Sequence, residues 1–140
     1  MSLYNIFGIS GSGSNAQNIR LNTTASNIAN ADTVASSAAE AYKARQPIFG
    51  VELNQALNRN HQQPGSKVEV LGIVESDRPA IREYKPGHPL ADNEGYIWKS
   101  NVNVVEEMAN MISASRSYSM NVQLADTAKN MLLQTLKLGK

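Results

Sequence analysis

The sequence predicts an elongated α+β protein, with N- and C-terminal helices paired as a coiled-coil-like layer and a small β-rich insertion between them. All five prolines fall between residues 47 and 89, and neither glycine nor proline occurs from Tyr96 to Leu138. Because proline inside a helix costs about 3 kcal/mol and glycine about 1 kcal/mol, the middle of the chain is broken and its end permits one long helix. A helix of about 34 residues is roughly 50 Å long. That exceeds what a compact chain of this length accommodates, since its radius of gyration is ~14 Å.

The C-terminal helix is predicted to run from about Val104 to Leu138. Asn103 is suited to cap its first turn. Glu106 and Glu107 suit the positive end of the helix dipole, and Lys137 suits the negative end. Apolar residues recur at steps of three and four, as on one face of a helix. The residues of this predicted stripe are Val104, Met108, Met111, Tyr118, Val122, Ala125, Leu132 and Leu136.

The N-terminal segment is predicted to supply the partner helix. Its apolar residues follow the same spacing, yet only Arg20 and Asp32 are charged within residues 1–39. A solvated helix normally carries a charged face. The segment is therefore either disordered until it binds or packed against protein on several sides, and a poor helix in a loose tail is the third alternative. The predicted packing residues are Ile19, Leu21, Ala25, Ile28 and Asn30.

The segment between the helices is predicted to be rich in strands and turns. The loop at 58–65 is polar and expected to be exposed. After a turn at 76–79, the third predicted strand is expected to return along the second. The predicted strands span Gln46–Leu53, Lys67–Glu75 and Ile81–Lys85, and a further apolar segment spans Tyr96–Trp98. The chain is thus divided into an N-terminal helical part (1–41), a β-rich insertion (42–100) and a C-terminal helical part (101–140).

The composition excludes several classes of function. Thirteen Lys and Arg against 12 Asp and Glu give a net charge of +1, which argues against a nucleic-acid binder. The absence of cysteine excludes disulfides, thiolate metal sites and cysteine nucleophiles. No run approaches the roughly 18 apolar residues of a membrane span, so no direct membrane insertion is expected. The N-terminus lacks the basic and continuous apolar regions of a secretory signal.

No catalytic, cofactor or metal site is predicted. His88, Asp92 and Glu94 form the one cluster that suggests a metal-dependent hydrolase, but their spacing matches no standard ligand signature. They lie among turn-forming residues, where polar side chains cap or solvate the backbone, and that structural role is favoured. Arg116 and Tyr118 on the predicted long helix are either a solvated charge and a core ring or contacts to a neighbouring subunit, and the pattern leaves both open.

Motifs at both ends of the chain resemble those of the axial rod and hook proteins of bacterial flagella. Residues Asn27–Thr33 and Tyr42–Arg45 resemble the N-terminal motif of the family. In this chain, Val34 and an Ala/Ser-rich stretch lie between the two segments. The C-terminal motif is similar to Ser113–Tyr118 and Met131–Leu138. Two further segments resemble those of proximal-rod members of the family. They are Tyr84–Tyr96 and Asn101–Met108. The residue before the second segment is Ser100, where such proteins often carry proline.

This resemblance implies a structural protein that assembles with copies of itself, with other rod proteins and with the adaptor at the basal-body ring. Such proteins form a hollow rod that crosses the periplasm, transmits torque and conducts exported subunits, and helices from both chain ends form its inner layer. They leave the cell through the flagellar type III export apparatus without a cleaved signal peptide. The alternative within the same class is another rod or hook-type protein. The short insertion and the segment Pro86–Tyr96 disfavour the longer distal-rod and hook proteins, which carry larger middle domains.

Overall fold

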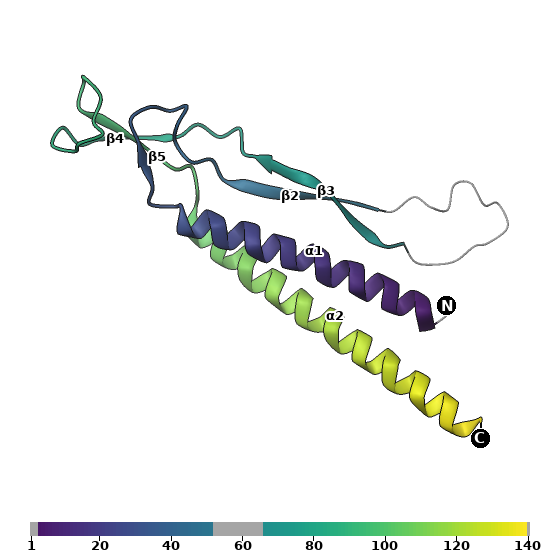
Figure 1. Cartoon of the computed structure of the whole chain (residues 1–140). Coiled ribbons are helices and arrows are strands. Elements are labelled where there is room, and N and C mark those ends of the chain that lie inside the picture. The colour runs from purple at the N-terminus through teal and green to yellow at the C-terminus, as the bar shows by residue number, and fades with distance from the viewer. Residues whose placement is uncertain (1–2, 52–65, 140) are drawn as a thin grey trace.

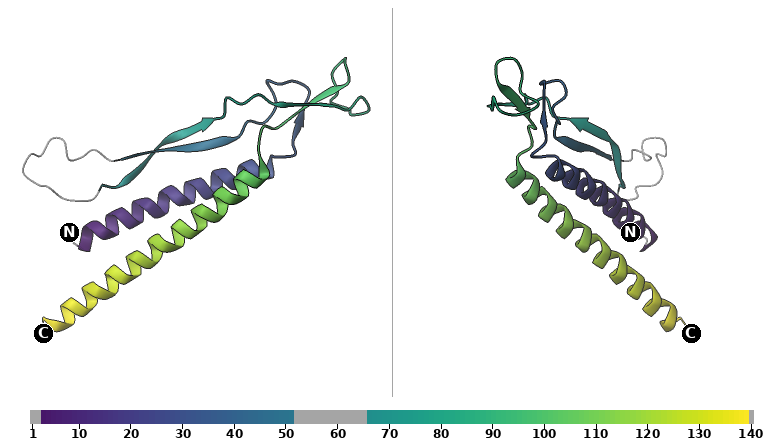
Figure 2. Two further views of the ribbon diagram at one scale, coloured as in Figure 1. Left: turned by 180° about the vertical axis from the view of Figure 1, so that it is seen from behind. Right: turned by 60° about the vertical axis from the view of Figure 1, so that its left-hand side comes forward.

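The computed structural model describes residues 3–51 and 66–139, and it confirms the elongated α+β fold (Figure 1). Two long helices, α1 (Leu3–Ala29) and α2 (Val104–Leu138), run antiparallel, so that the two ends of the chain lie at the same end of the molecule. The strands lie beyond the opposite end of the helix pair and along α1. Figure 2 shows the same arrangement from behind and from the side.

Helix α2 has the predicted bounds because its ends are defined locally. The Oδ1 of Asn103 accepts hydrogen bonds from the backbone N–H of Val105 at 3.1 Å and of Glu106 at 3.4 Å. Such a cap satisfies donors that have no partner within the helix. Glu106 and Glu107 lie in the first turn and Lys137 in the last, as the dipole favours.

Helix α1 is continuous through three glycines and packs on two sides. It contacts α2 on one side and the strands β2 and β3 on another, which agrees with the prediction of a segment packed against protein and contradicts the loose tail. Glycine permits close approach at one of these contacts. A Cβ on Gly13 would lie 2.8 Å from the Nδ2 of Asn121 on α2, so a larger residue there would displace that amide.

The strands form two separate antiparallel sheets. The three-stranded sheet has the order β1-β5-β4, made of β1 (Val34–Ala35), β5 (Tyr96–Lys99) and β4 (Ile81–Tyr84). The second sheet is a hairpin of β2 (Arg45–Val51) and β3 (Val68–Glu75), with an irregularity between Ile48 and Phe49. The predicted polar loop at 58–65 and the predicted end of the first strand at Leu53 lie outside the described residues.

The prediction that the strand at 81–85 returns along the preceding strand is wrong. Strand β4 pairs with β5, from Ile81 opposite Lys99 to Tyr84 opposite Tyr96. The chain turns away from β3 because the segment after it is held elsewhere. The N–H of Ser76 still donates to the carbonyl oxygen of Ala44 at 2.8 Å, next to the Arg45–Glu75 pair of the hairpin. Two residues later, the Nδ2 of Asn101 donates to the carbonyl oxygen of Arg78 at 2.6 Å and holds the chain there.

The buried core is small and consists mainly of alanine. Ile97 is the largest fully buried apolar side chain among the described residues. The other buried apolar residues are Ala16, Ala31, Ala41, Ala44, Val102, Ala114 and Ala128. Most large aliphatic side chains are consequently left at the surface of a single chain. Within the described residues, neither helix combines the length and apolar character needed to cross a membrane.

Candidate functional site: the helix pair and its polar junction

The contact between α1 and α2 is made mainly by small and polar side chains. On α2, Ala114 and Ala128 are buried, and on α1 the buried residues include Ala16 and Thr24. Two hydrogen bonds between side chains of the described residues cross the pair, from the Nη2 of Arg20 to the Oδ1 of Asn110 at 2.9 Å and from the Nδ2 of Asn27 to the Oε2 of Glu107 at 3.1 Å. Small side chains let two helices approach closely, but they bury little apolar area. The pair therefore uses little of the apolar surface that α2 carries.

That unused surface, here called the outer apolar surface of α2, runs along most of the helix. Its side chains are between 37% and 76% exposed in the single chain. Fully burying one such side chain contributes about 1.5–3 kcal/mol, and large apolar side chains exposed in such number along one helix mark an interaction site. The outer apolar surface consists of Val104, Val105, Met108, Ile112, Tyr118, Met120, Val122, Leu124, Met131, Leu133 and Leu136.

The apolar stripe predicted on α2 contains both half-buried and exposed residues in the structure. The members that are half-buried beside α1 are Met111, Ala125 and Leu132. The members that are exposed are Val104, Met108, Tyr118, Val122 and Leu136. Arg116, the separate candidate for a subunit contact, is exposed as well. On α1 and its end, Ile19, Leu21, Ile28 and Asn30 are half-buried and Ala25 is exposed. As contacts between subunits, all of these residues remain a prediction, because a single chain contains no such contact.

A network of buried polar side chains joins the helix pair to the insertion. Asn27, near the end of α1, is 0% exposed. Its Nδ2 donates to the carbonyl oxygen of Arg45 at 2.8 Å and to the Oε2 of Glu107 at 3.1 Å. Its Oδ1 accepts from the N–H of Arg45 at 2.9 Å and from the hydroxyl of Tyr42 at 3.1 Å. The amide thus uses both of its donors and both acceptor positions.

A second asparagine, Asn101, also binds backbone groups of the insertion, beginning with Ala44, the residue before Arg45. The Oδ1 of Asn101 accepts from the N–H of Ala44 at 2.7 Å, while its Nδ2 donates to the carbonyl oxygen of Arg78. The apolar cluster beside it contains only Ala31, Ala44 and Val102, with Tyr42 packed against it. We refer to the four side chains that connect the parts here, together with the backbone of Arg45 that they hold, as the polar junction. The four side chains are those of Asn27, Tyr42, Asn101 and Glu107.

Sequence reasoning missed the polar junction, although a signal for it was present. From the sequence, Glu107 is expected only to complement the helix dipole, and no role is expected for the side chain of Asn27. An asparagine inside a helix is disfavoured by propensity, because its side chain competes for backbone hydrogen bonds. Its position beside Ile28 in an almost uncharged segment indicates a tertiary partner, but nothing in the local sequence identifies that partner.

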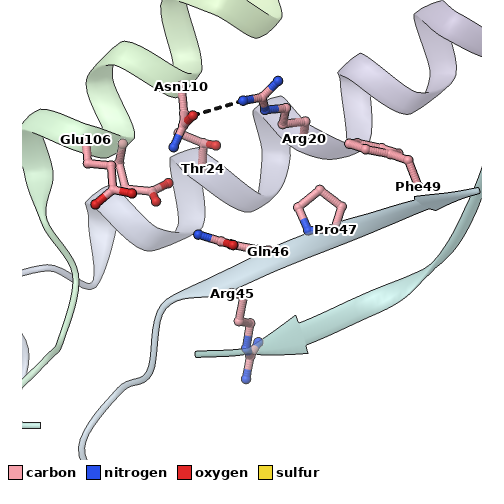
Figure 3. Close-up of a pocket in the computed structure, with 9 residues that line it drawn as sticks. Arg20, Thr24, Arg45, Gln46, Pro47, Phe49, Glu106 and Asn110 are labelled. Carbon is pink, nitrogen blue, oxygen red and sulfur yellow. Dashed lines mark hydrogen bonds between the residues drawn. The ribbon is translucent and has the colours of Figure 1, made fainter. Parts of the chain in front are cut away.

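A surface cavity of about 360 Å³ lies where α1, α2 and β2 meet (Figure 3). Arg20 and Asn110 are joined by a hydrogen bond at one wall, with Glu106 on the same helix as Asn110. The guanidinium of Arg45 instead pairs with Glu75 on β3 at 3.2 Å. Among the described residues, no group of three His, Cys, Asp or Glu side chains is placed to hold a metal ion.

The side chains of the candidate hydrolase cluster cap turns in the loop between β4 and β5. The Nδ1 of His88 accepts from the N–H of Leu90 at 3.1 Å. The Oδ1 of Asp92 accepts from the N–H groups of Glu94 and Tyr96, both at 2.9 Å. The Oε2 of Glu94 pairs with Arg82 at 2.6 Å. These contacts agree with the capping role that the sequence favoured.

Two ammonium groups hold a carboxylate in the same sheet. The Nζ of Lys85 lies 3.2 Å from the Oε1 of Glu83, and the Nζ of Lys99 lies 3.3 Å from its Oε2. Hydrogen bonding to Lys85, then to Lys99, lowers the pKa of Glu83 below its ordinary value. All three side chains are solvent-accessible, so this is a surface ion-pair cluster within the β4–β5 sheet.

Comparison with known proteins assigns the chain to a family. Residues 8–35 match the family described as flagella basal body rod protein, and residues 93–138 match the flagellar basal body rod FlgEFG protein C-terminal family. The flagellar basal-body rod protein FlgC of Salmonella typhimurium is 45% identical over 140 residues, which cover all of both chains. FlgC proteins of Yersinia enterocolitica and Buchnera aphidicola from Acyrthosiphon pisum are 45% and 39% identical, again over the full length of each chain. The chain belongs to the FlgC family of flagellar basal-body rod proteins.

The regions that match the rod families coincide with one part of this FlgC-family fold. Residues 8–35 cover most of α1 and the strand β1, and residues 93–138 cover β5 and α2. Since β1 pairs with β5 and α1 packs on α2, the two matched regions are neighbours in space. The hairpin of β2 and β3 lies between them in sequence. As a FlgC-family member, the protein is a structural component of the flagellar basal body.

Proposed function

We propose that this FlgC-family protein is a structural subunit of the proximal rod, which assembles through the outer apolar surface of α2. The observation that carries the proposal is that α2 uses different side chains for its contact with α1 and leaves its larger apolar side chains exposed. Its contact with α1 uses small side chains such as Ala114 and Ala128, whereas larger ones such as Met108 and Leu136 are 54% and 63% exposed. A helix this long gains most of its stability from packing an apolar face. Neighbouring subunits supply that packing in the assembled rod.

The remaining features of the proposed function follow from membership of the FlgC family and from the motifs at both ends of the chain. The subunit contacts other copies of itself, other rod proteins and the basal-body ring adaptor. It reaches the periplasm through the flagellar type III export apparatus without cleavage of a signal peptide, and it catalyses no reaction. Residues 1–41 and 101–140 form the inner layer of the rod, and residues 42–100 form the insertion outside that layer. Torque passes through the packed helices.

Cysteine accessibility tests the proposed interface, because the natural chain contains no cysteine. Met108→Cys places a thiol on the outer apolar surface, and Ala128→Cys places one on the buried side of the helix pair. We expect the thiol at Met108 to react with a maleimide rapidly in the purified chain and slowly in isolated basal bodies. The control thiol at Ala128 is expected to react slowly in both. Equal reactivity at Met108 in the two states would refute assembly through this surface.

A further inference from the structure

We infer that Asn27 and Glu107 are positioning residues that hold the β2–β3 hairpin in its orientation along α1. The contact is direct. Both backbone groups of Arg45, the first residue of β2, bind the side-chain amide of Asn27 at 2.8 and 2.9 Å. The amide occupies the place that a neighbouring strand would take. The orientation of the hairpin where it leaves the helices is therefore set by one side chain of α1.

Glu107 determines which way that amide faces. Glu107 is 4% exposed, and its carboxylate accepts from the Nδ2 of Asn27 at 3.1 Å. A carboxylate can only accept, so the nitrogen must face α2 and the oxygen must face Tyr42 and the N–H of Arg45. The hairpin on α1 is thus coupled to the formation of the first turn of α2.

Apolar packing contributes little to holding the hairpin. Most of its large apolar side chains are exposed, and an isolated two-stranded hairpin is only marginally stable in water. At its far end, one side-chain hydrogen bond runs from the N–H of Val68 to the Oγ of Ser12 on α1 at 3.1 Å. The exposed apolar residues of the hairpin are Ile48, Phe49, Val51, Val68, Leu71, Ile73 and Val74. The polar junction therefore carries most of the restraint at the start of the hairpin.

The relevance of this orientation to assembly rests on the proposed function, whereas the orientation itself does not. A rod subunit must present its insertion in one direction to fit repeated neighbours. A buried, fully paired amide supplies such a direction, because every other arrangement leaves a buried donor or acceptor without a partner. Asn27→Asp removes both donors and places a second carboxylate against Glu107, so it separates orientation from the apolar packing of the helices.

Native-state amide hydrogen exchange on the purified full chain tests the inference. Asn27→Asp is expected to lower protection of the β2–β3 amides about a hundredfold, while amides at 114–128 of α2 keep theirs. The double variant Asn27→Asp/Glu107→Gln is expected to recover part of the loss, because the Gln amide can donate to the new carboxylate. Asn22→Asp adds the same charge at an exposed position of α1 and is expected to leave the hairpin unchanged.

Two outcomes would overturn the inference. One is unchanged hairpin protection in Asn27→Asp, and the other is an equal loss in the hairpin and in α2, which would indicate general destabilisation. If Asn27→Asp does not fold, Tyr42→Phe removes a single donor to the same oxygen and carries the test with the same two outcomes. Assembly is measured separately, by asking whether each variant restores rods in a bacterial strain that lacks its own gene for this protein. A variant with a loosened hairpin that still builds rods would refute the role in assembly and leave the proposed rod function intact.

Discussion

Ala114→Leu tests the packing of the helix pair in the isolated chain. Ala114 is 0% exposed on the side of α2 that α1 covers, so three additional carbon atoms have no space there. Overpacking of this kind costs about 1–3 kcal/mol. With a urea dependence of about 2 kcal/mol per molar, the unfolding midpoint should fall by roughly 1 M. Unfolding is followed by circular dichroism at 222 nm, where both helices contribute.

Ala109→Leu is the matched control, because it makes the same change at an exposed position five residues earlier on α2. Exposed substitutions usually change stability by less than about 0.5 kcal/mol, so its midpoint should stay within about 0.3 M of the parent. If Ala114→Leu unfolds at the same urea concentration as Ala109→Leu, the two helices do not pack closely in the free subunit. The structural account of the pair would then be refuted.

Three further predictions concern the surface. Leu136→Asp, at a 63% exposed position, should leave the urea midpoint of the monomer unchanged but abolish motility, because assembly would bury a carboxylate at several kcal/mol per ion; normal swarming would contradict this. His88→Ala removes only the acceptor for the N–H of Leu90, so motility should persist, and its loss would reopen the loop as a functional site. The pairs of Glu83 with the two lysines stabilise the folded state at any pH above 4.5, the ordinary pKa of the carboxyl group. This contribution is lost as the pH falls through the lowered pKa of the folded state, because Glu83 is then protonated. Carboxyl titration by NMR should show Lys99→Gln raising that pKa, and an unchanged titration would refute the pairing.

Features set by local sequence were predictable. The bounds of α2 follow from the cap at Asn103, the dipole-matched ends and the absence of breakers between Tyr96 and Leu138. The strands β2, β3 and β4 follow from short apolar segments between turn residues. Each of these assignments depends on interactions within a few positions of the chain, which a single sequence contains.

Features set by distant partners were not predictable. Strand β4 pairs with β5 rather than β3, because Asn101 fixes the chain at Arg78 before β4 begins. The role of Asn27 depends on Glu107, 80 positions away. The side of α2 that faces α1 is likewise set by close approach of Ala114 and Ala128, whereas an apolar pattern emphasises the larger side chains. A hydrophobic stripe thus indicates that α2 has partners without separating the partner within the chain from those outside it.

A cryo-EM map of basal bodies assembled with this protein tests the central claim most directly. The account predicts that each subunit keeps its α1–α2 pair, with Asn27 against Glu107, and that neighbouring subunits cover the outer apolar surface from Met108 to Leu136. The claim would be contradicted if that surface faced water in the assembled rod. It would equally be contradicted if α1 and α2 of each subunit were separated in the rod and α2 packed on neighbouring subunits through the side that α1 covers in the single chain.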